Sequence, residues 1–353
     1  MAACDGTNPF MTATAPDGST EPLEPGDPNT TVSSKFLWDP ARSLTMNSVV
    51  YDEATDTLTI NNLPFDGPDG KYDHVADAPD GTPIYASRQT STTGLLKHYA
   101  LFLRSDYIEA TAAGSGDWGD YGNAGANVNR SSFSLPSSGE YVYVGDYAGL
   151  RTFDEKGGIE LVTGDMELIL DILDFDPLNG IQGDIIGTIT NRTRVNVDGT
   201  DDRDLPDVYL KEVSFDSSTG VFEGGAVESY RPDNGDPWST GTYDGMLAGP
   251  DAAEVGAYLI MEGLADIQII SYQVVDWTLP DGSSGTASGL DTIDADAFQD
   301  LINAGGTLPT GVIAAVGVPA GATIVSDTVE TQTFETEYKA QEIGVLVGDQ
   351  VIP

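Results

Sequence analysis

The chain has 353 residues and carries 57 acidic against 15 basic side chains, which gives a formal charge of −42 and an isoelectric point near 4.1. So few Lys and Arg residues exclude a surface that binds duplex nucleic acid through its phosphates, and they argue against docking on anionic lipid. The apolar fraction of 39% is enough for a packed core, which excludes wholesale disorder. A folded body this acidic suggests a salty habitat, such as that of a marine bacterium, where counterions screen self-repulsion.

The start of the chain places two small residues before its single cysteine. Ala2 and Ala3 precede Cys4, as at the end of a bacterial lipoprotein signal. This predicts lipidation of Cys4 and an outer-membrane lipoprotein of a Gram-negative cell envelope, facing the surface or the periplasm; an ordinary free cysteine is the alternative. Six prolines between residues 5 and 47, among Gly, Thr, Asp and Ser, predict that residues 1–47 are the anchor site and a disordered tether.

From residue 48 the pattern changes to short strands. Residues 49–51 and 57–60 flank the polar turn 52–56 and predict a hairpin. Further strand segments follow at 98–104, 140–147, 158–161, 166–173, 181–190, 208–215, 220–230, 241–247 and 254–262. This spacing predicts an all-β sandwich or barrel. One short helix is expected at 295–304, capped by Asp294, within an insertion near 279–325, before strands resume at 328–338 and 342–351.

Glycine-rich segments in the middle of the chain carry a family resemblance. Residues 220–224 read GVFEG and residues 249–257 read GPDAAEVGA. With the segments 145–150 and 183–189, they resemble the C-terminal barrel of the transferrin-binding protein B family of bacterial surface lipoproteins, over residues 139–263. The resemblance implies an eight-stranded antiparallel up-and-down barrel over residues 131–353, preceded by an N-terminal β handle-like region at 48–130.

The same resemblance implies a non-enzymatic role. Family members bind a ligand for uptake, so we expect a protein or an iron- or haem-carrying ligand, handed on to a TonB-dependent outer-membrane receptor. Members that capture transferrin have two lobes, and this chain has room for one. A structural envelope lipoprotein without a nutrient ligand is the alternative.

No catalytic constellation is apparent in the sequence. The chain has two histidines and no GxSxG motif, so no enzyme is predicted. The run from Gly114 to Gly119 matches GxGxxG, but loop-like residues follow it where a dinucleotide site needs a helix. His98 is expected to pack on a strand and His74 to lie in a polar loop. Haem ligation by His98, Tyr141 or Tyr143 is the alternative to ordinary packing.

Two groups of residues are candidate contact sites. Aromatic residues in or beside loops are expected to anchor a protein partner, namely Trp118, Tyr121, Trp238 and Tyr243. The acidic loop around Gly199 offers oxygen ligands for calcium, namely Asp198, Asp201, Asp202 and Asp204. In a chain of this charge, a solvated acidic loop is the alternative to a calcium site.

Overall fold

The computed structural model of the chain is all-β, which confirms the predicted fold class. It describes residues 33–351 except 62, 65, 67–69, 89–95, 118–119, 137, 155, 177–179, 233, 290–317 and 336–337. For residues 173–176, 180–182, 201–202, 267–273, 288–289 and 327–335 it describes the backbone alone. The chain divides into two units, which are described separately: one runs to Ala265 and resumes at Tyr338, and the other is Asp266–Glu337.

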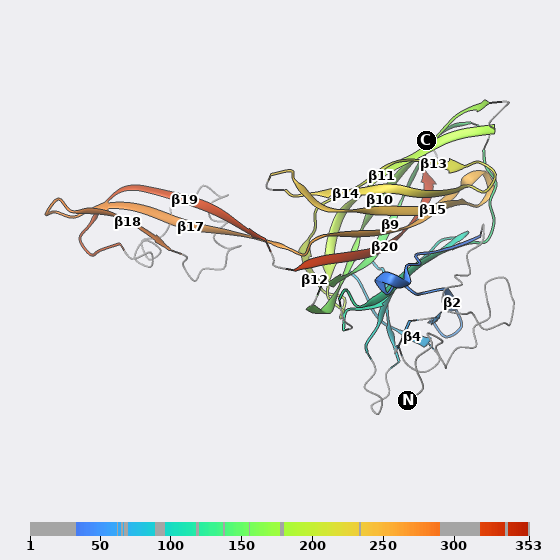
Figure 1. Cartoon of the computed structure of the whole chain (residues 1–353), viewed down its shortest axis with the longest axis horizontal. Helices are drawn as coiled ribbons and strands as arrows, with labels where there is room; N and C mark the ends of the chain where they lie inside the picture. Colours follow the sequence, from blue (N-terminus) through green and yellow to red (C-terminus); the bar gives the residue numbers. More distant parts are fainter. Residues whose placement is uncertain are drawn as a thin grey trace. The chain divides into compact units, whose positions relative to one another are not determined.

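The first unit begins with an eight-stranded antiparallel sheet, the N-terminal sheet, which runs from blue to green in Figure 1. Its strand order is β1-β8-β7-β6-β5-β4-β3-β2. The strands are β1 (Ser34–Phe36), β2 (Ser48–Asp52), β3 (Thr57–Asn61), β4 (Lys71–Asp77), β5 (Pro83–Ser87), β6 (Tyr99–Arg104), β7 (Ile108–Ser115) and β8 (Asn123–Arg130). The predicted hairpin is confirmed as β2 and β3.

The N-terminal sheet starts earlier than the composition indicates. A tether is predicted up to residue 47, but β1 pairs with β8, and Leu44 and Met46 are buried. The backbone N–H of Thr45 donates to the carbonyl of Ala124. An exposed strand edge can satisfy the backbone of such a polar segment, so a few apolar anchors suffice to order it. Residues 34–47 therefore belong to the folded body.

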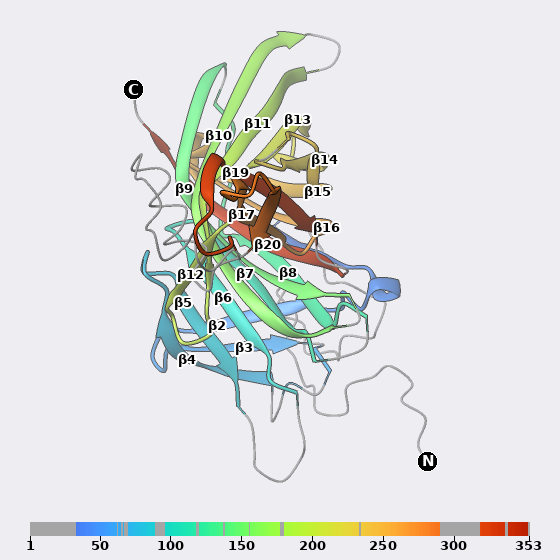
Figure 2. The ribbon, with the colours of Figure 1, turned by 90° about the vertical axis from the view of Figure 1, so that its left-hand side faces the viewer.

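Eight antiparallel strands form a closed barrel (Figure 2). They are β9 (Gly139–Phe153), β10 (Lys156–Asp176), β11 (Gly180–Val195), β13 (Val208–Asp216), β14 (Val221–Tyr230), β15 (Pro237–Ala248), β16 (Glu254–Leu264) and β20 (Lys339–Val351). Each strand pairs with the next, and β20 closes the ring by pairing with both β16 and β9. The short β12 (Asp201–Asp204) adds to β11. The up-and-down barrel is thus confirmed. Its last strand, β20, follows the second unit in the sequence.

Aromatic rings and glycines share the interior of the barrel. Phe222 on β14 and Tyr243 on β15 are buried with ring centroids 5.9 Å apart. A Cβ on Gly225 would lie 2.1 Å from the Tyr243 ring, and one on Gly245 would lie 2.3 Å from Phe222. The glycines therefore make room for the rings, which is the scaffold role that the glycine–aromatic pattern indicates.

Small residues let the N-terminal sheet pack closely on the outside of the barrel. Ala110, Ala112, Ala124 and Ala126 from β7 and β8 are fully buried against outward-facing barrel residues such as Val345. The opposite face of the N-terminal sheet has a core of its own, which includes Leu58, Ile60, Tyr72, Tyr85 and Phe102. The N-terminal sheet is thus held by two apolar cores, one shared with the barrel and one on its opposite face.

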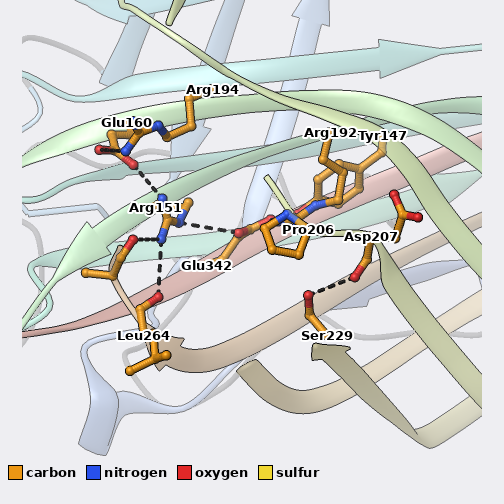
Figure 3. Close-up of polar contacts among 11 residues, drawn as sticks. Tyr147, Arg151, Glu160, Arg192, Arg194, Pro206, Asp207, Ser229, Leu264 and Glu342 are labelled. Carbon is orange, nitrogen blue, oxygen red and sulfur yellow. Dashed lines mark hydrogen bonds and ion pairs between the residues drawn. The ribbon is translucent and has the colours of Figure 1, made fainter. Parts of the chain in front are cut away.

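A cluster of buried charges lies inside the barrel (Figure 3). Arg151, Arg192 and Arg194 face Glu160 and Glu342. Arg151 Nη1 lies 2.7 Å from Glu160 Oε2, and the hydroxyl of Tyr147 donates to Glu342 over 2.6 Å. Burial alone would lower the pKa of Arg192, but Glu342 raises it above its ordinary value. The cluster cross-links β9, β10, β11 and β20.

The second unit is a three-stranded antiparallel sheet. Its order is β18-β17-β19, from β17 (Ile267–Thr278), β18 (Ser284–Gly289) and β19 (Thr323–Glu335). The helix expected at 295–304 lies outside the described residues. Among the residues that the structure covers, no helix is long and apolar enough to cross a membrane.

Candidate binding site

Two of the four predicted aromatic contacts are buried in the barrel wall. Trp238 is 7% exposed and Tyr243 is 1% exposed, and the hydroxyl of Tyr243 donates to the carbonyl of Lys211 over 2.6 Å. Both lie on β15, and Tyr243 belongs to the core inside the barrel. The prediction that they present a contact surface is therefore wrong. Tyr121 is half-buried, and burial with the nearby Glu262 and Asp154 raises its pKa. Trp118 and the lipidation candidate Cys4 lie outside the described residues.

The acidic loop near Gly199 is organised by local hydrogen bonds. Asp198 Oδ1 accepts from the backbone N–H and the hydroxyl of Thr200, at 3.1 and 2.7 Å, which lowers the pKa of Asp198. Asp204 is exposed on β12, and nothing is described of the Asp201 and Asp202 side chains. Within the described part of the chain, no group of three or more acidic, His or Cys side chains could hold a metal ion. Calcium binding by this loop stays a prediction.

The residues considered for haem make internal contacts. The hydroxyl of Tyr143 is buried and donates to the carbonyl of Ala252 over 2.7 Å, and that of Tyr141 donates to the carbonyl of Ser138 over 2.9 Å. His98 is fully buried with Nδ1 3.3 Å from the carbonyl of Leu96, and burial lowers its pKa to about 4. These contacts are typical of packed side chains.

A cavity of about 370 Å³ opens on the N-terminal sheet. We call it the tyrosine pocket. Its lining includes Tyr51, Asp56, His74, Asp80, Tyr85, Phe102, Leu103, Arg104 and, from barrel strand β9, Asp146. The pocket therefore lies where the N-terminal sheet meets the barrel, and it lies within the first unit alone. Its volume falls in the lower part of the range of small-molecule sites, about 300–1,000 Å³.

Asp56 organises one wall of the tyrosine pocket. It sits in the turn between β2 and β3 with φ of 49°, a left-handed conformation that Asp tolerates. Its Oδ1 accepts hydrogen bonds from the hydroxyls of Tyr85 at 2.7 Å and Tyr51 at 3.2 Å. The hydrogen bond from Tyr85 is the main cause of a lowered pKa at Asp56, so this carboxylate stays ionised.

His74 is held between two carboxylates. It lies on β4, not in a loop as predicted, with Nδ1 2.8 Å from Asp56 Oδ2 and Nε2 2.9 Å from Asp77 Oδ1. Burial alone would lower the pKa of His74, but the hydrogen bonds to Asp56 and Asp77 raise it. Since both ring nitrogens face acceptors, the arrangement favours the protonated imidazolium.

Aromatic rings form the remaining wall. The ring of Phe102 lies 4.8 Å from Tyr51 and 6.3 Å from Tyr85, the second contact edge-on. The guanidinium of Arg104 lies 5.5 Å from the centre of the Tyr51 ring. Arg104 also pairs with Glu53 at 3.8 Å and Glu109 at 3.5 Å. The pocket lining thus combines aromatic side chains with carboxylates.

Sequence reasoning missed this site because its residues are dispersed. Tyr51, His74, Tyr85 and Phe102 come from four strands, and the register that brings them together depends on pairing across the whole N-terminal sheet. The available signal was that Tyr51 and Phe102 lie in segments predicted as strands, whose side chains project from the faces of a sheet.

Comparison with known proteins adds little. No family model and no curated protein matches the chain. A solved structure described as "Crystal Structure of Surface Lipoprotein" aligns with 53% of this chain and 90% of its own, at 11% identity and a TM-score of 0.28. With a score this low, the argument rests on the chain's own geometry.

Proposed function

We propose that the chain is a non-enzymatic binding protein of the cell envelope whose tyrosine pocket recognises its ligand. The observation that carries the proposal is the pocket itself, whose lining includes the aromatic side chains of Tyr51, Tyr85 and Phe102 and the carboxylates of Asp56, Asp80 and Asp146. Aromatic side chains contribute large contact areas and dominate recognition sites. The barrel and the N-terminal sheet hold the pocket between them as a rigid scaffold.

The wider setting of the proposal comes from the sequence. The residues before Cys4 support a lipid anchor, and the glycine motifs support a single-lobed relative of the transferrin-binding protein B family. On this reading the ligand is a protein or an iron- or haem-carrying molecule, passed to a TonB-dependent receptor. The calcium loop near Asp198 is a separate proposal of lower priority. A purely structural envelope protein is the competing role, and it needs no pocket.

The test is a pull-down from spent medium and solubilised envelope with the folded chain as bait. Asp146→Trp fills the pocket from β9, where Asp146 is exposed, so a new ring should not disturb the core. The matched control is Ile186→Trp, which adds the same ring at a position 45% exposed on β11, outside the pocket lining. We expect a saturable partner that binds wild type and Ile186→Trp but not Asp146→Trp. Equal capture of a partner by wild type and both variants contradicts the proposal, and so does the absence of any captured partner at marine salt.

A further inference from the structure

His74 connects a turn and a strand end of the N-terminal sheet. On one side its Nδ1 lies 2.8 Å from Oδ2 of Asp56, in the turn between β2 and β3. On the other side its Nε2 lies 2.9 Å from Oδ1 of Asp77 and 2.9 Å from the carbonyl oxygen of Ala76, at the end of β4. The pairing of β4 with β5 is irregular between His74 and Ala76, so a regular ladder does not hold this stretch of backbone. The imidazole therefore bridges a turn and an irregular strand end.

The bridge needs a proton on both ring nitrogens. The oxygens of Asp56, Asp77 and Ala76 that face the ring are all acceptors. A neutral imidazole carries one N–H, so either tautomer turns a lone pair towards an acceptor. Asp56 is held in place, since the hydroxyls of Tyr85 and Tyr51 donate to its other oxygen. The side chain of Asp77 is 62% exposed and can turn into solvent, but the carbonyl of Ala76 can move only with the backbone. Loss of the proton therefore acts on the end of β4.

The end of β4 leads directly into a turn that lines the tyrosine pocket. Two backbone hydrogen bonds close this turn, from the N–H of Ala78 to the carbonyl of Thr82 and from the N–H of Gly81 to the carbonyl of Ala78, both at 2.9 Å. Oδ1 of Asp80 also accepts from the backbone N–H of Thr82 at 2.9 Å. Asp80, Gly81 and Thr82 belong to the pocket lining. The turn is thus a small hydrogen-bonded unit attached to the strand end that His74 holds.

The charges around this imidazole are mostly negative. Besides its two carboxylate partners, the charged or titratable side chains of the elements packed around it are Tyr85 on β5, Asp198 in the loop whose Gly199 approaches the carbonyl of Asp77, and, in the same pocket lining, Asp80, Arg104 and Asp146. The ring of Tyr85 lies 5.2 Å from the imidazole and stays neutral, because burial raises its pKa. Arg104 is already paired with Glu53 and Glu109. The surroundings therefore favour the imidazolium.

We propose that the proton on His74 controls the tyrosine pocket: the imidazolium holds the end of β4 against Asp56 and keeps the 78–82 turn in the pocket wall, and the neutral imidazole releases both. The inference rests on the proposed function, since it names the regulation of the same site. The closed wall raises the proton affinity of His74, so it is favoured below pH ~6.5 and is lost as the pH rises through the pKa of His74 in the folded protein. Ligand capture therefore falls from weakly acidic to alkaline pH.

The proton on His74 can be followed directly, because the chain has only two histidines. An NMR titration of the full chain reports both imidazole rings, and His74→Gln identifies the signals. We expect a pKa above ~6.5 for His74 and a pKa of about 4 for the fully buried His98. Asp77→Asn should lower the pKa of His74, because it removes one of the two carboxylates. Asp251→Asn should leave it unchanged, since it makes the same charge change in the turn Pro250–Ala252, where Asp251 has a φ of 53° that Asn also tolerates.

Hydrogen exchange at the backbone N–H groups of Ala78 and Gly81 reports release of the turn. Protection factors, corrected for the intrinsic effect of pH on exchange, are measured by mass spectrometry from about pH 5 to about pH 9. By linkage, protection should fall about tenfold for each pH unit by which the measured pKa of His74 exceeds ~6.5. In His74→Gln the protection should not change with pH. Asp66 also titrates, with a pKa of about 7, but it is present in both proteins, so the difference between them belongs to His74.

Three results would overturn the inference in protein shown to be folded by circular dichroism. They are a pKa of His74 at or below ~6.5 or unchanged in Asp77→Asn, protection of the turn that stays constant through the titration, and the same pH response in His74→Gln. Failure of the proposed function is a separate result. A partner captured through the pocket equally at acidic and alkaline pH would keep the binding site and remove its control by His74. A turn released as expected, with no captured partner, would keep the switch and remove the proposed function.

Discussion

Asp66 is a carboxylic acid enclosed by protein. Its side chain is 2% exposed and accepts a hydrogen bond from the hydroxyl of Tyr72 at 3.2 Å. Burial raises its pKa to about 7. Because the folded state holds this proton more tightly than the unfolded state, the group stabilises the fold most below pH ~4, and that contribution is lost as the pH rises towards 7.

Asp66→Asn removes this titration while keeping an oxygen for Tyr72. The raised pKa corresponds to a cost of about 4 kcal/mol for ionising the buried Asp66 at high pH. Burying the amide of Asn also costs free energy, so we expect the variant to be more stable than wild type by about 2 kcal/mol at pH 8. At pH 4 the advantage should vanish. Urea unfolding at the two pH values measures the difference in free energy of unfolding between the variant and wild type. The general effect of pH on this acidic chain is the same for both proteins, so it cancels in that difference. An equal difference at both pH values contradicts the assignment.

The arginine cluster in the barrel supports a second prediction at this scale. Glu342 is 5% exposed and faces both Arg151 and Arg192. Glu342→Gln leaves two buried guanidinium groups short of a counterion, and we expect it to lower the free energy of unfolding by about 3 kcal/mol. Glu262→Gln is the control, because Glu262 pairs with Arg42 at the surface and should cost below about 1 kcal/mol. Urea midpoints that are the same for the two variants would argue against the cluster's role.

Among the elements, strands with large apolar residues were predictable and alanine-rich strands were not. Residues 208–215 and 254–262 were predicted within two residues of β13 and β16. The segments 158–161 and 166–173 are one strand, β10, which carries an irregularity after Thr163. β7 and β8 escaped prediction because Ala and Gly have low strand propensity. Their small side chains serve the contact between two layers, which no local pattern reveals.

Glycine positions in the barrel strands give a prediction at the element scale. A Cβ on Gly344 of β20 would lie 2.2 Å from the hydroxyl oxygen of Tyr147, a ring that is fully buried. We expect Gly344→Ala to destabilise the protein by about 2 kcal/mol, since the ring cannot move without losing its bond to Glu342. Gly157→Ala on β10 is the control, because the nearest atom to its Cβ would be 3.5 Å away. Thermal unfolding of both variants tests the difference, and equal melting temperatures would contradict it.

At the scale of the whole molecule, the barrel was predictable through its glycine motifs and the binding site was not. The tyrosine pocket requires Asp146 of the barrel beside Asp80 of the N-terminal sheet, a proximity set by packing of two layers. The aromatic residues nearest to predicted loops, Trp238 and Tyr243, proved to be buried strand residues. Sequence proximity to a turn is therefore a poor guide to exposure in a barrel.

The second unit should be dispensable for folding of the first. β16 and β20 pair along their full length, and Leu264 faces Lys339 at the last step of the ladder. Replacing residues 266–337 with Asn-Gly places a two-residue hairpin turn between Ala265 and Tyr338. We expect the shortened chain to keep its strand signal in circular dichroism and to unfold cooperatively within roughly 5 °C of wild type. Loss of cooperative unfolding would show that the barrel depends on the second unit.

The central claim, that the tyrosine pocket is the recognition site, is tested most directly in the cells that make the protein. Glu53 has an 80% exposed side chain and lies beside Arg104 at the pocket rim, so a photo-crosslinking residue there should not disturb the fold. We predict a ligand or partner adduct after irradiation with the crosslinker at position 53, and none with the crosslinker at position 251 in the turn Pro250–Ala252. No adduct at position 53, or the same adduct at both positions, would contradict the account.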